Sequence, residues 1–143
     1  MQVKIKKLNE NCILPKYQTE YSAGCDLHAV TSETVEPGET KLIGTGFAVE
    51  IPLGFAGFIF ARSGMALKRG LAPANKVGVI DSDYRGEVMV AVHNHSKTTQ
   101  QIEQGERIAQ LVILPVYQVD FTMIDEVTET DRGAGGFGST GSK

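Results

Sequence analysis

Short strand-like segments punctuated by turn residues constrain the fold of this chain more than any other feature of its sequence. Runs rich in β-branched and aromatic residues recur roughly every ten residues and end at turn signals such as Pro37-Gly38 and Gln104-Gly105. That spacing is typical of an all-β sandwich or barrel. We expect strands at residues 3–6, 24–30, 41–51, 57–61, 76–80, 88–92, 107–114 and 117–121.

One segment, residues 63–70, has the composition of a short helix. Ser63 can cap its start, Lys68 and Arg69 suit its last turn, and Gly70 can end it. The two basic residues could add charge near a bound anion, but a solvated helix end is the simpler interpretation. Because helices and strands do not alternate along the chain, a parallel α/β fold is disfavoured.

Charge and cysteine content exclude several classes of function. A net charge of −3 provides no long-range attraction for a nucleic acid polymer or an anionic membrane, and no stretch approaches the length of a membrane span. Cys12 and Cys25 are widely spaced, as in reduced thiols of a cytoplasmic protein. His93 and His95 would share a strand face, but without a nearby third ligand they do not predict a transition-metal site.

The segment 76–92 places a polar stretch between two short apolar runs. Asp, Ser and Gly between the runs favour a β-hairpin with a charged tip at residues 81–87, although such residues are also ordinary turn formers. Gly78 sits inside the first predicted arm, where glycine forgoes side-chain packing. One common reason is that a ligand must approach the backbone closely.

Two other stretches carry phosphate-binding chemistry. Residues 133–138 formally match the dinucleotide fingerprint GxGxxG, but the strand and helix that the fingerprint requires are absent from this context. The glycine-rich amides, Ser139, Thr140 and Arg132 can still donate to phosphate oxygens. Arg62, with the free amides of the predicted helix start, is a second candidate. Two anion sites and a carboxylate cluster are what a metal-assisted nucleoside triphosphate site requires.

Five motifs in order then identify a family resemblance. They are residues 23–29, 61–68, 75–87, 105–111 and 132–141, and together they closely resemble the motifs of the homotrimeric dUTPases. The resemblance implies a distorted jelly-roll β-barrel or sandwich, with one short helix and a glycine-rich flexible C-terminal tail. It also implies a homotrimer with active sites at subunit interfaces, which hydrolyses dUTP to dUMP and pyrophosphate with Mg²⁺. Ala61, Met65 and Glu106 depart from the commonest family residues without removing a needed group.

The resemblance also assigns a role to individual residues. Asp81 would be the general base that polarises the water attacking the α-phosphorus, and Tyr84 would exclude a ribose 2′-hydroxyl, while Asp83 and Arg85 look structural. Asp26 would support Mg²⁺ indirectly, through its bound water. Residues 1–131 would form the jelly-roll domain and residues 132–143 its phosphate and uracil lid. Uracil and deoxyribose would be bound by Asn75, Gly78, Val79, Ile80, Tyr84, Met89 and Phe137, and the phosphates by Arg62, Ser63, Gly64, Gln110, Arg132, Gly138, Ser139 and Thr140.

Three alternatives stay open at this point. A dCTP deaminase shares the fold, but it would need a glutamate general base near the pyrimidine, where this chain has Asp81 and an intact glycine-rich tail. A uridine-nucleotide sensor would bind dUTP without hydrolysing it, and no added domain or insertion supports that role. A purely structural jelly roll leaves the five motifs unexplained.

Overall fold

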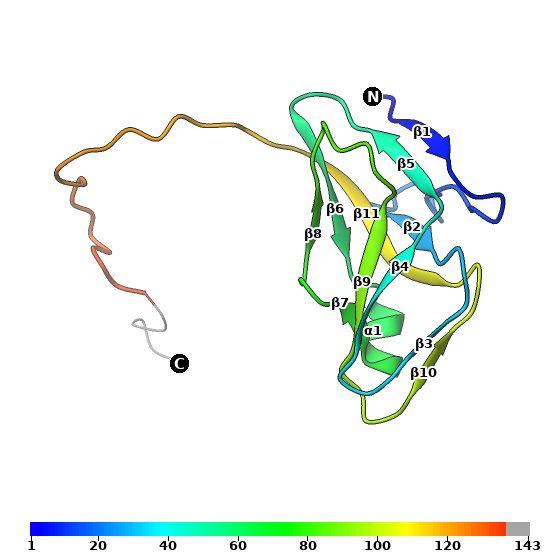
Figure 1. Cartoon of the computed structure of the whole chain (residues 1–143). Helices are drawn as coiled ribbons and strands as arrows, with labels where there is room; N and C mark the ends of the chain where they lie inside the picture. Colours follow the sequence, from blue (N-terminus) through cyan, green and yellow to red (C-terminus); the bar gives the residue numbers. More distant parts are fainter. Residues whose placement is uncertain (137–143) are drawn as a thin grey trace.

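The computed structural model describes residues 1–136, so the predicted site residues Phe137, Gly138, Ser139 and Thr140 lie outside the described part. Within it the chain forms short strands and one helix, which confirms the all-β class with a single short helix (Figure 1). In chain order the elements are β1 (Lys4–Lys7), β2 (Cys25–His28), β3 (Glu33–Val35), β4 (Thr40–Gly44), β5 (Phe47–Glu50), β6 (Phe55–Phe60), α1 (Ser63–Arg69), β7 (Leu71–Pro73), β8 (Gly78–Ile80), β9 (Met89–Asn94), β10 (Gln100–Ile102) and β11 (Arg107–Pro115).

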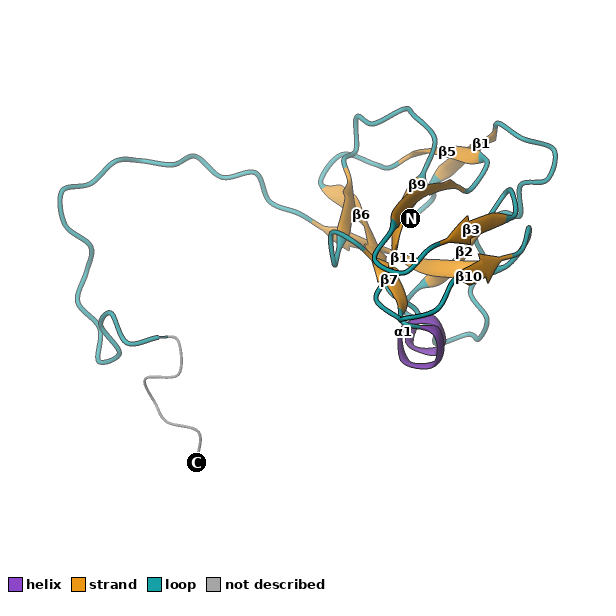
Figure 2. Ribbon diagram, turned by 60° about the horizontal axis from the view of Figure 1, so that its bottom comes forward, coloured by secondary structure: helices purple, strands orange, loops and turns teal. Residues whose placement is uncertain are grey.

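Antiparallel pairing organises these strands around one apolar core. The largest sheet has the order β2-β11-β6-β8, a second has the order β4-β9-β7, and β1-β5 and β3-β10 form two-stranded ribbons. Fully buried side chains from several sheets meet inside, among them Leu27, Ile43, Phe47, Leu71 and Ile102. The helix lies at one end of the strands, and the segment after β11 runs away from the body (Figure 2). No helix among the described residues is long and apolar enough to cross a membrane.

The predicted hairpin between residues 76–80 and 88–92 is wrong. β8 pairs with β6, whereas β9 pairs with β4 and β7, so the two arms belong to different sheets. Ile80 and Val88 are nonetheless both buried in the shared core. Two short apolar runs joined by a polar segment can pair with each other or cross between packed sheets, and the local sequence does not distinguish these outcomes.

The predicted strand 41–51 is interrupted between β4 and β5. Gly46 adopts a φ of 77°, and the Thr45 hydroxyl donates to the Val88 carbonyl at 2.6 Å. The predicted strand at 117–121 is also wrong, because Tyr117 and Phe121 are 89% and 96% exposed and this segment pairs with no described strand. Three strands were missed, β3, β7 and β10, and each has only three residues.

The helix was predicted almost at its observed bounds. Gly70 takes the left-handed conformation, with φ 67°, and its N–H donates to the Ala66 carbonyl, as expected for a C-terminal cap. Ser63, however, is the first helical residue and not the cap. Arg62 occupies the cap position in extended backbone and provides no side-chain capping bond.

Candidate active site

Seven of the predicted substrate and catalytic residues line one pocket of about 280 Å³. We call it the tip pocket, because it lies against the 81–87 connection between β8 and β9. Leu42, Ile59, Glu87 and Val88 complete its lining. The predicted members are Asn75, Gly78, Val79, Ile80, Asp81, Tyr84 and Met89.

Close backbone packing shapes the floor of the tip pocket. A Cβ on Gly78 would lie 3.2 Å from the Cβ of Ile59, so a side chain there would crowd the β6–β8 contact. Just before β8, Lys76 takes a φ of 64°, which is uncommon for a residue with a side chain. Its N–H donates to the Pro73 carbonyl at 3.1 Å, and this tight turn presents Asn75 to the pocket.

The tip is fixed by bonds between its own residues. The Tyr84 hydroxyl donates to the Glu87 carbonyl at 3.0 Å, and the Arg85 guanidinium donates to the carbonyls of Ser82 at 2.7 Å and Tyr84 at 3.0 Å. A Cβ on Gly86 would lie only 2.3 Å from the Tyr84 hydroxyl oxygen. The glycine therefore lets the tyrosine ring fold back on the tip and hold one position.

Asp81 is the exposed carboxylate of the tip pocket. Its side chain accepts no hydrogen bond from any residue in the described part of the chain, so both oxygens can accept from a ligand or a water molecule. A carboxylate in this position can take a proton from a nearby nucleophile.

The remaining predicted residues of the described body gather in a second pocket of about 300 Å³ at the start of α1. We call this one the helix-end pocket. Gln18 and Ser22 also line it. Sequence reasoning missed them because they lie in an irregular loop outside every motif. The full lining is Gln18, Ser22, Ala23, Gly24, Asp26, Arg62, Ser63, Gly64 and Gln110.

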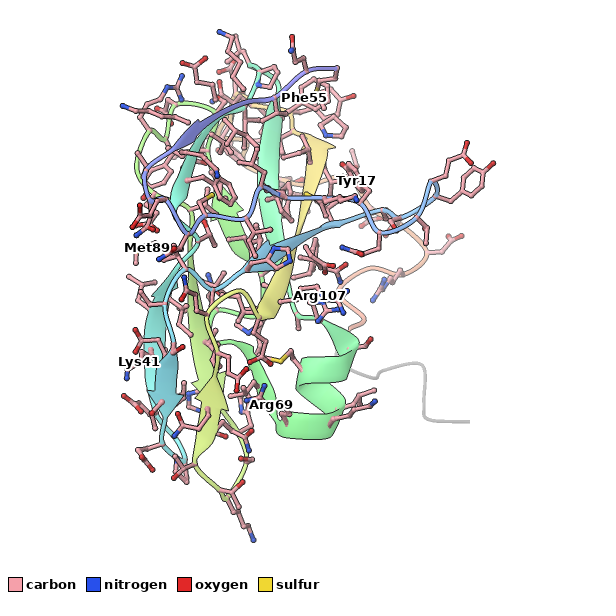
Figure 3. The ribbon with its side chains drawn as sticks, turned by 90° about the vertical axis from the view of Figure 1, so that its right-hand side faces the viewer. Tyr17, Lys41, Phe55, Arg69, Met89 and Arg107 are labelled. Atoms are coloured by element: carbon pink, nitrogen blue, oxygen red, sulfur yellow. The ribbon has the colours of Figure 1, made fainter. Side chains whose placement is uncertain are left out.

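A buried carboxylate organises the helix-end pocket. Asp26 is 6% exposed, and it pairs with Arg62 Nε at 2.9 Å through Oδ1 and with Arg107 Nη1 at 3.3 Å through Oδ2. One negative and two positive charges leave a local surplus of positive charge, which suits an anionic ligand. Arg107 was not predicted as a site residue. Figure 3 shows it beside the start of α1.

Glycine also positions the amide of Gln110. A Cβ on Gly24 would lie 2.8 Å from Gln110 Oε1, so the bare glycine allows β2 and β11 to hold this side chain between them. Gln110 Nε2 donates to the Ala61 carbonyl at 3.0 Å, next to Arg62. The amide therefore faces the same space as the helix start.

Burial affects the titratable groups on β2. The pKa of His28 lies below its ordinary value of 6.5, first because of desolvation and then because of Arg107 and Arg62, whereas Asp26 opposes the shift. Burial raises the pKa of the Cys25 thiol, which donates to the Leu111 carbonyl at 3.3 Å. Cys12 and Cys25 are both free, as expected from their spacing, and both are buried.

The two pockets lie at opposite edges of the largest sheet. The order β2-β11-β6-β8 puts Asp26 on one edge strand and Gly78 on the other. Three strand spacings separate them, about 14 Å. Arg132 reaches neither pocket; its Nε donates to the Gly135 carbonyl at 2.8 Å within the extended segment. One chain therefore does not bring all its predicted site residues together.

Comparisons with known proteins point to one family. The dUTPase family model covers residues 10–141. A deoxyuridine 5'-triphosphate nucleotidohydrolase of Nautilia profundicola is 52% identical over 99% of both chains, and that of a Picosynechococcus species is 48% identical over 99% of this chain and all of its own.

Solved structures give the same result. The dUTPase of Staphylococcus bacteriophage 80alpha with dUpNHpp, a dUTP analogue, has a TM-score of 0.92, 29% identity and 98% coverage of both chains. A variant dUTPase of phage phi11, described with a structural Mg(II) ion, has a TM-score of 0.83 and 27% identity over 88% of this chain and 98% of its own. The predicted jelly-roll fold is confirmed. The full-length similarity and the shared fold show that this chain belongs to the dUTPase family.

Proposed function

We propose that the protein hydrolyses dUTP to dUMP and pyrophosphate with Mg²⁺, at sites formed between the chains of a cytoplasmic homotrimer. The separation of the tip pocket from the helix-end pocket is the observation that carries this proposal, because each has the chemistry for one half of a nucleoside triphosphate. A helix-end pocket contributed by a neighbouring chain would complete each tip pocket.

The tip pocket would bind the nucleoside. β8 is an edge strand, so one side of its main chain is left unpaired by the described strands and can bond the uracil edge at Gly78, Val79 and Ile80. Asn75 would add its amide and Met89 an apolar wall. The fixed ring of Tyr84 would lie against the deoxyribose, where it leaves no room for a 2′-hydroxyl.

Asp81 would act as the general base. Its carboxylate would take a proton from a water molecule while the water oxygen forms a bond to the α-phosphorus. The bond from the α-phosphorus to the bridging oxygen breaks, and pyrophosphate leaves with that electron pair. Both Asp81 oxygens are free of described hydrogen-bond donors, which supports this role.

The helix-end pocket would bind the phosphates through Arg62, Gln110 and the amides of Ser63 and Gly64. Mg²⁺ would neutralise phosphate charge and polarise the reacting phosphoryl group. Asp26 fits an indirect role toward this ion, because its two arginine bonds leave lone pairs on both oxygens that can accept from metal-bound water. Mg²⁺ takes few protein ligands when phosphates are present.

Residues 132–143 would form a lid that closes over the bound nucleotide. Arg132 would reach the γ-phosphate, Phe137 would stack on uracil, and Gly138, Ser139 and Thr140 would contact the phosphates. The described part of the C-terminal segment supports binding of this segment to another chain. The segment after β11 runs away from the body (Figure 2), and its Phe121 and Met123 are each 96% exposed. A large contiguous apolar surface on a monomer marks a contact with a partner, and a run of exposed apolar residues along this segment can provide one.

Pyrophosphate release from dUTP, UTP, dCTP and dTTP, measured in parallel with Mg²⁺, tests the proposal. We expect turnover of dUTP alone, by a species whose mass in light scattering is that of a trimer. Ammonia released from dCTP would instead support a deaminase. Tight dUTP binding without pyrophosphate would support a nucleotide sensor.

A further inference from the structure

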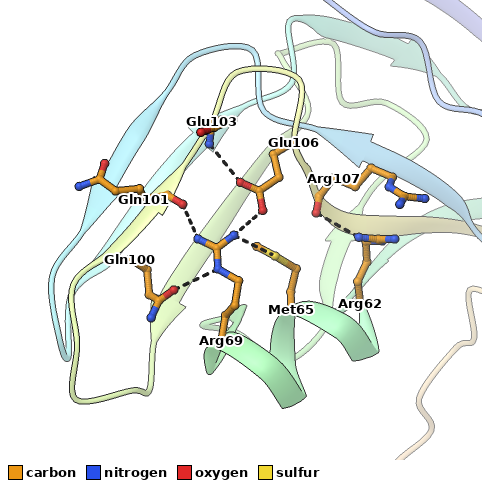
Figure 4. Close-up of polar contacts among 8 residues, drawn as sticks. All are labelled: Arg62, Met65, Arg69, Gln100, Gln101, Glu103, Glu106 and Arg107. Atoms are coloured by element: carbon orange, nitrogen blue, oxygen red, sulfur yellow. Dashed lines mark hydrogen bonds and ion pairs between the residues drawn. The ribbon is translucent and has the colours of Figure 1, made fainter.

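Arg69, at the C-terminal end of α1, is not the solvated charge that its sequence position suggests. Its side chain is 26% exposed and forms an ion pair with Glu106 (Figure 4). Nη2 donates to the Gln101 carbonyl, and Nε donates to Gln100 Oε1 at 3.0 Å. The neighbouring Lys68 is exposed, so only one of the two basic residues serves the fold.

Glu106 joins this contact to the turn between β10 and β11. While Oε1 binds Arg69, Oε2 accepts a hydrogen bond from the Glu103 N–H at 3.0 Å. The Glu106 side chain is 29% exposed, so the pair is partly shielded from water. Charge-assisted bonds of this kind are stronger than those of fully exposed pairs.

The opposite end of the helix is bound to Arg107, the residue after Glu106 and the first of β11. Arg62 Nη1 donates to the Arg107 carbonyl at 3.3 Å, and the Arg62 and Arg107 side chains share Asp26. Two consecutive residues, Glu106 and Arg107, therefore hold the two ends of α1. Figure 4 shows both attachments on one side of the helix.

Polar side-chain contacts supplement a backbone bond at the end of α1, where the His95 N–H donates to the Gly70 carbonyl at 2.8 Å. The helix spans seven residues, too few for independent stability, and Met65 is its one buried residue. Arg69 Nη1 also lies 3.7 Å from Met65 Sδ, so the guanidinium packs on that buried side chain. Without the Arg69 side chain, the helix would lose its bonds to Gln100, Gln101 and Glu106, and its last turn would depend on the backbone bond between Gly70 and His95.

We propose that Arg69 and Glu106 are positioning residues for triphosphate binding. They hold α1 against the β10–β11 turn and thereby set the direction of Arg62 and of the Ser63 and Gly64 amides in the helix-end pocket. Neither residue lines that pocket. This inference rests on the proposed function, in which the helix-end pocket binds the phosphates of dUTP.

The test compares Arg69→Met and Glu106→Gln with the full-length parent, with Lys68→Met as the matched control. Binding of dUpNHpp and of deoxyuridine, which lacks phosphate, is measured beside kcat and KM for dUTP. In Arg69→Met we expect the Kd for dUpNHpp and the KM for dUTP to rise about tenfold, as for loss of an orienting partner. Deoxyuridine binding and the preference for dUTP over UTP should stay at the parental level, and Lys68→Met should behave as the parent.

Two further variants make the result decisive. Arg69→Lys should recover part of the loss, and the Arg69→Met/Glu106→Gln double variant should be no worse than Arg69→Met alone, because the two residues act through one contact. If Arg69→Met does not fold, dUpNHpp binding by Glu106→Gln tests the inference in its place. Parental dUpNHpp binding in the folded variants, or an equal loss of deoxyuridine binding, would overturn the inference. A parent that fails to hydrolyse dUTP would instead refute the proposed function.

Discussion

The tip pocket and the helix-end pocket are built in different ways. Most of the tip pocket comes from one stretch, residues 75–89, and its hydrogen bonds join close neighbours such as Tyr84 and Glu87, three residues apart. The helix-end pocket combines a loop, β2, α1 and β11, and its Asp26–Arg107 bond joins residues 81 positions apart. The nucleoside half of the proposed site is therefore local, whereas the phosphate half depends on the whole fold.

Their charges differ as well. The tip pocket has a carboxylate, Asp81, that receives no bond from the described residues, whereas the carboxylate of Asp26 is buried between two guanidinium groups. Substitutions in the tip pocket should therefore change chemistry and selectivity. Substitutions around the helix end should change affinity for the triphosphate.

The largest effect is expected for Asp81→Asn. Removing the proposed base should lower kcat for dUTP at least about 10³-fold while dUpNHpp binding stays within about threefold of the parent. Stopped-flow turnover and calorimetric binding measure the two quantities. Asp83→Asn is the matched control, since it removes the other aspartate of the tip and should keep most of the activity. Unchanged turnover in Asp81→Asn would remove this residue from the mechanism.

Deletion of residues 132–143 should have the next largest effect on activity. The proposed lid serves both pockets, so its loss should lower kcat about 100-fold, comparable to losing one preorganised donor at a reacting group. Sedimentation should show an intact trimer, because the deletion leaves every described strand in place. Full activity of the truncated chain would refute the lid.

Asp26→Asn tests the helix-end pocket. It keeps the shape of the side chain but leaves two guanidinium groups facing a neutral amide, so Arg62 should lose its fixed direction. The KM for dUTP should rise about 10- to 100-fold. The ratio of kcat/KM for dUTP and UTP should not change, because that selectivity belongs to the tip pocket. A changed ratio would show that the helix-end pocket also affects the selectivity for dUTP over UTP.

Gly86→Ala makes the complementary test in the tip pocket. The new methyl group would overlap Tyr84, so the ring should move and the preference for dUTP over UTP should fall about tenfold. Binding of pyrophosphate, which has no sugar, should be unaffected. Tyr84→Ala provides the reference for complete loss of the ring. Parental selectivity in both variants would rule out a steric role for Tyr84.

The smallest effect concerns pH and stability. Because the pKa of His28 is lower in the folded protein than its ordinary 6.5, the folded state favours the neutral ring. Its contribution to stability is complete above about pH 6.5 and is lost as the pH falls through the folded-state pKa. Melting temperatures measured from pH 7.5 down to pH 5 should therefore fall less steeply for His28→Gln than for the parent. Parallel curves would exclude His28 as a source of the pH dependence.

Prediction from sequence succeeded where a feature depends on near neighbours. The helix end at Gly70 follows from contiguous residues. Prediction from sequence failed where a strand can pair either with its neighbour in the sequence or with a distant strand. The runs at 76–80 and 88–92 are both short and apolar, and only the packed sheets pair β8 with β6 and β9 with β4 and β7.

Features that depend on near neighbours were determined by the sequence, and features that depend on distant residues were decided by the tertiary structure. The sequence by itself determined the all-β class, the family and the chemical groups of the proposed site, because these depend on residue types at short spacings. Only the tertiary structure decided that Arg69 holds the helix, that Arg107 joins Arg62 at Asp26, and that the two pockets lie at opposite edges of a sheet. Those relations join residues far apart in the chain, and strand order and side-chain contacts alone bring them together.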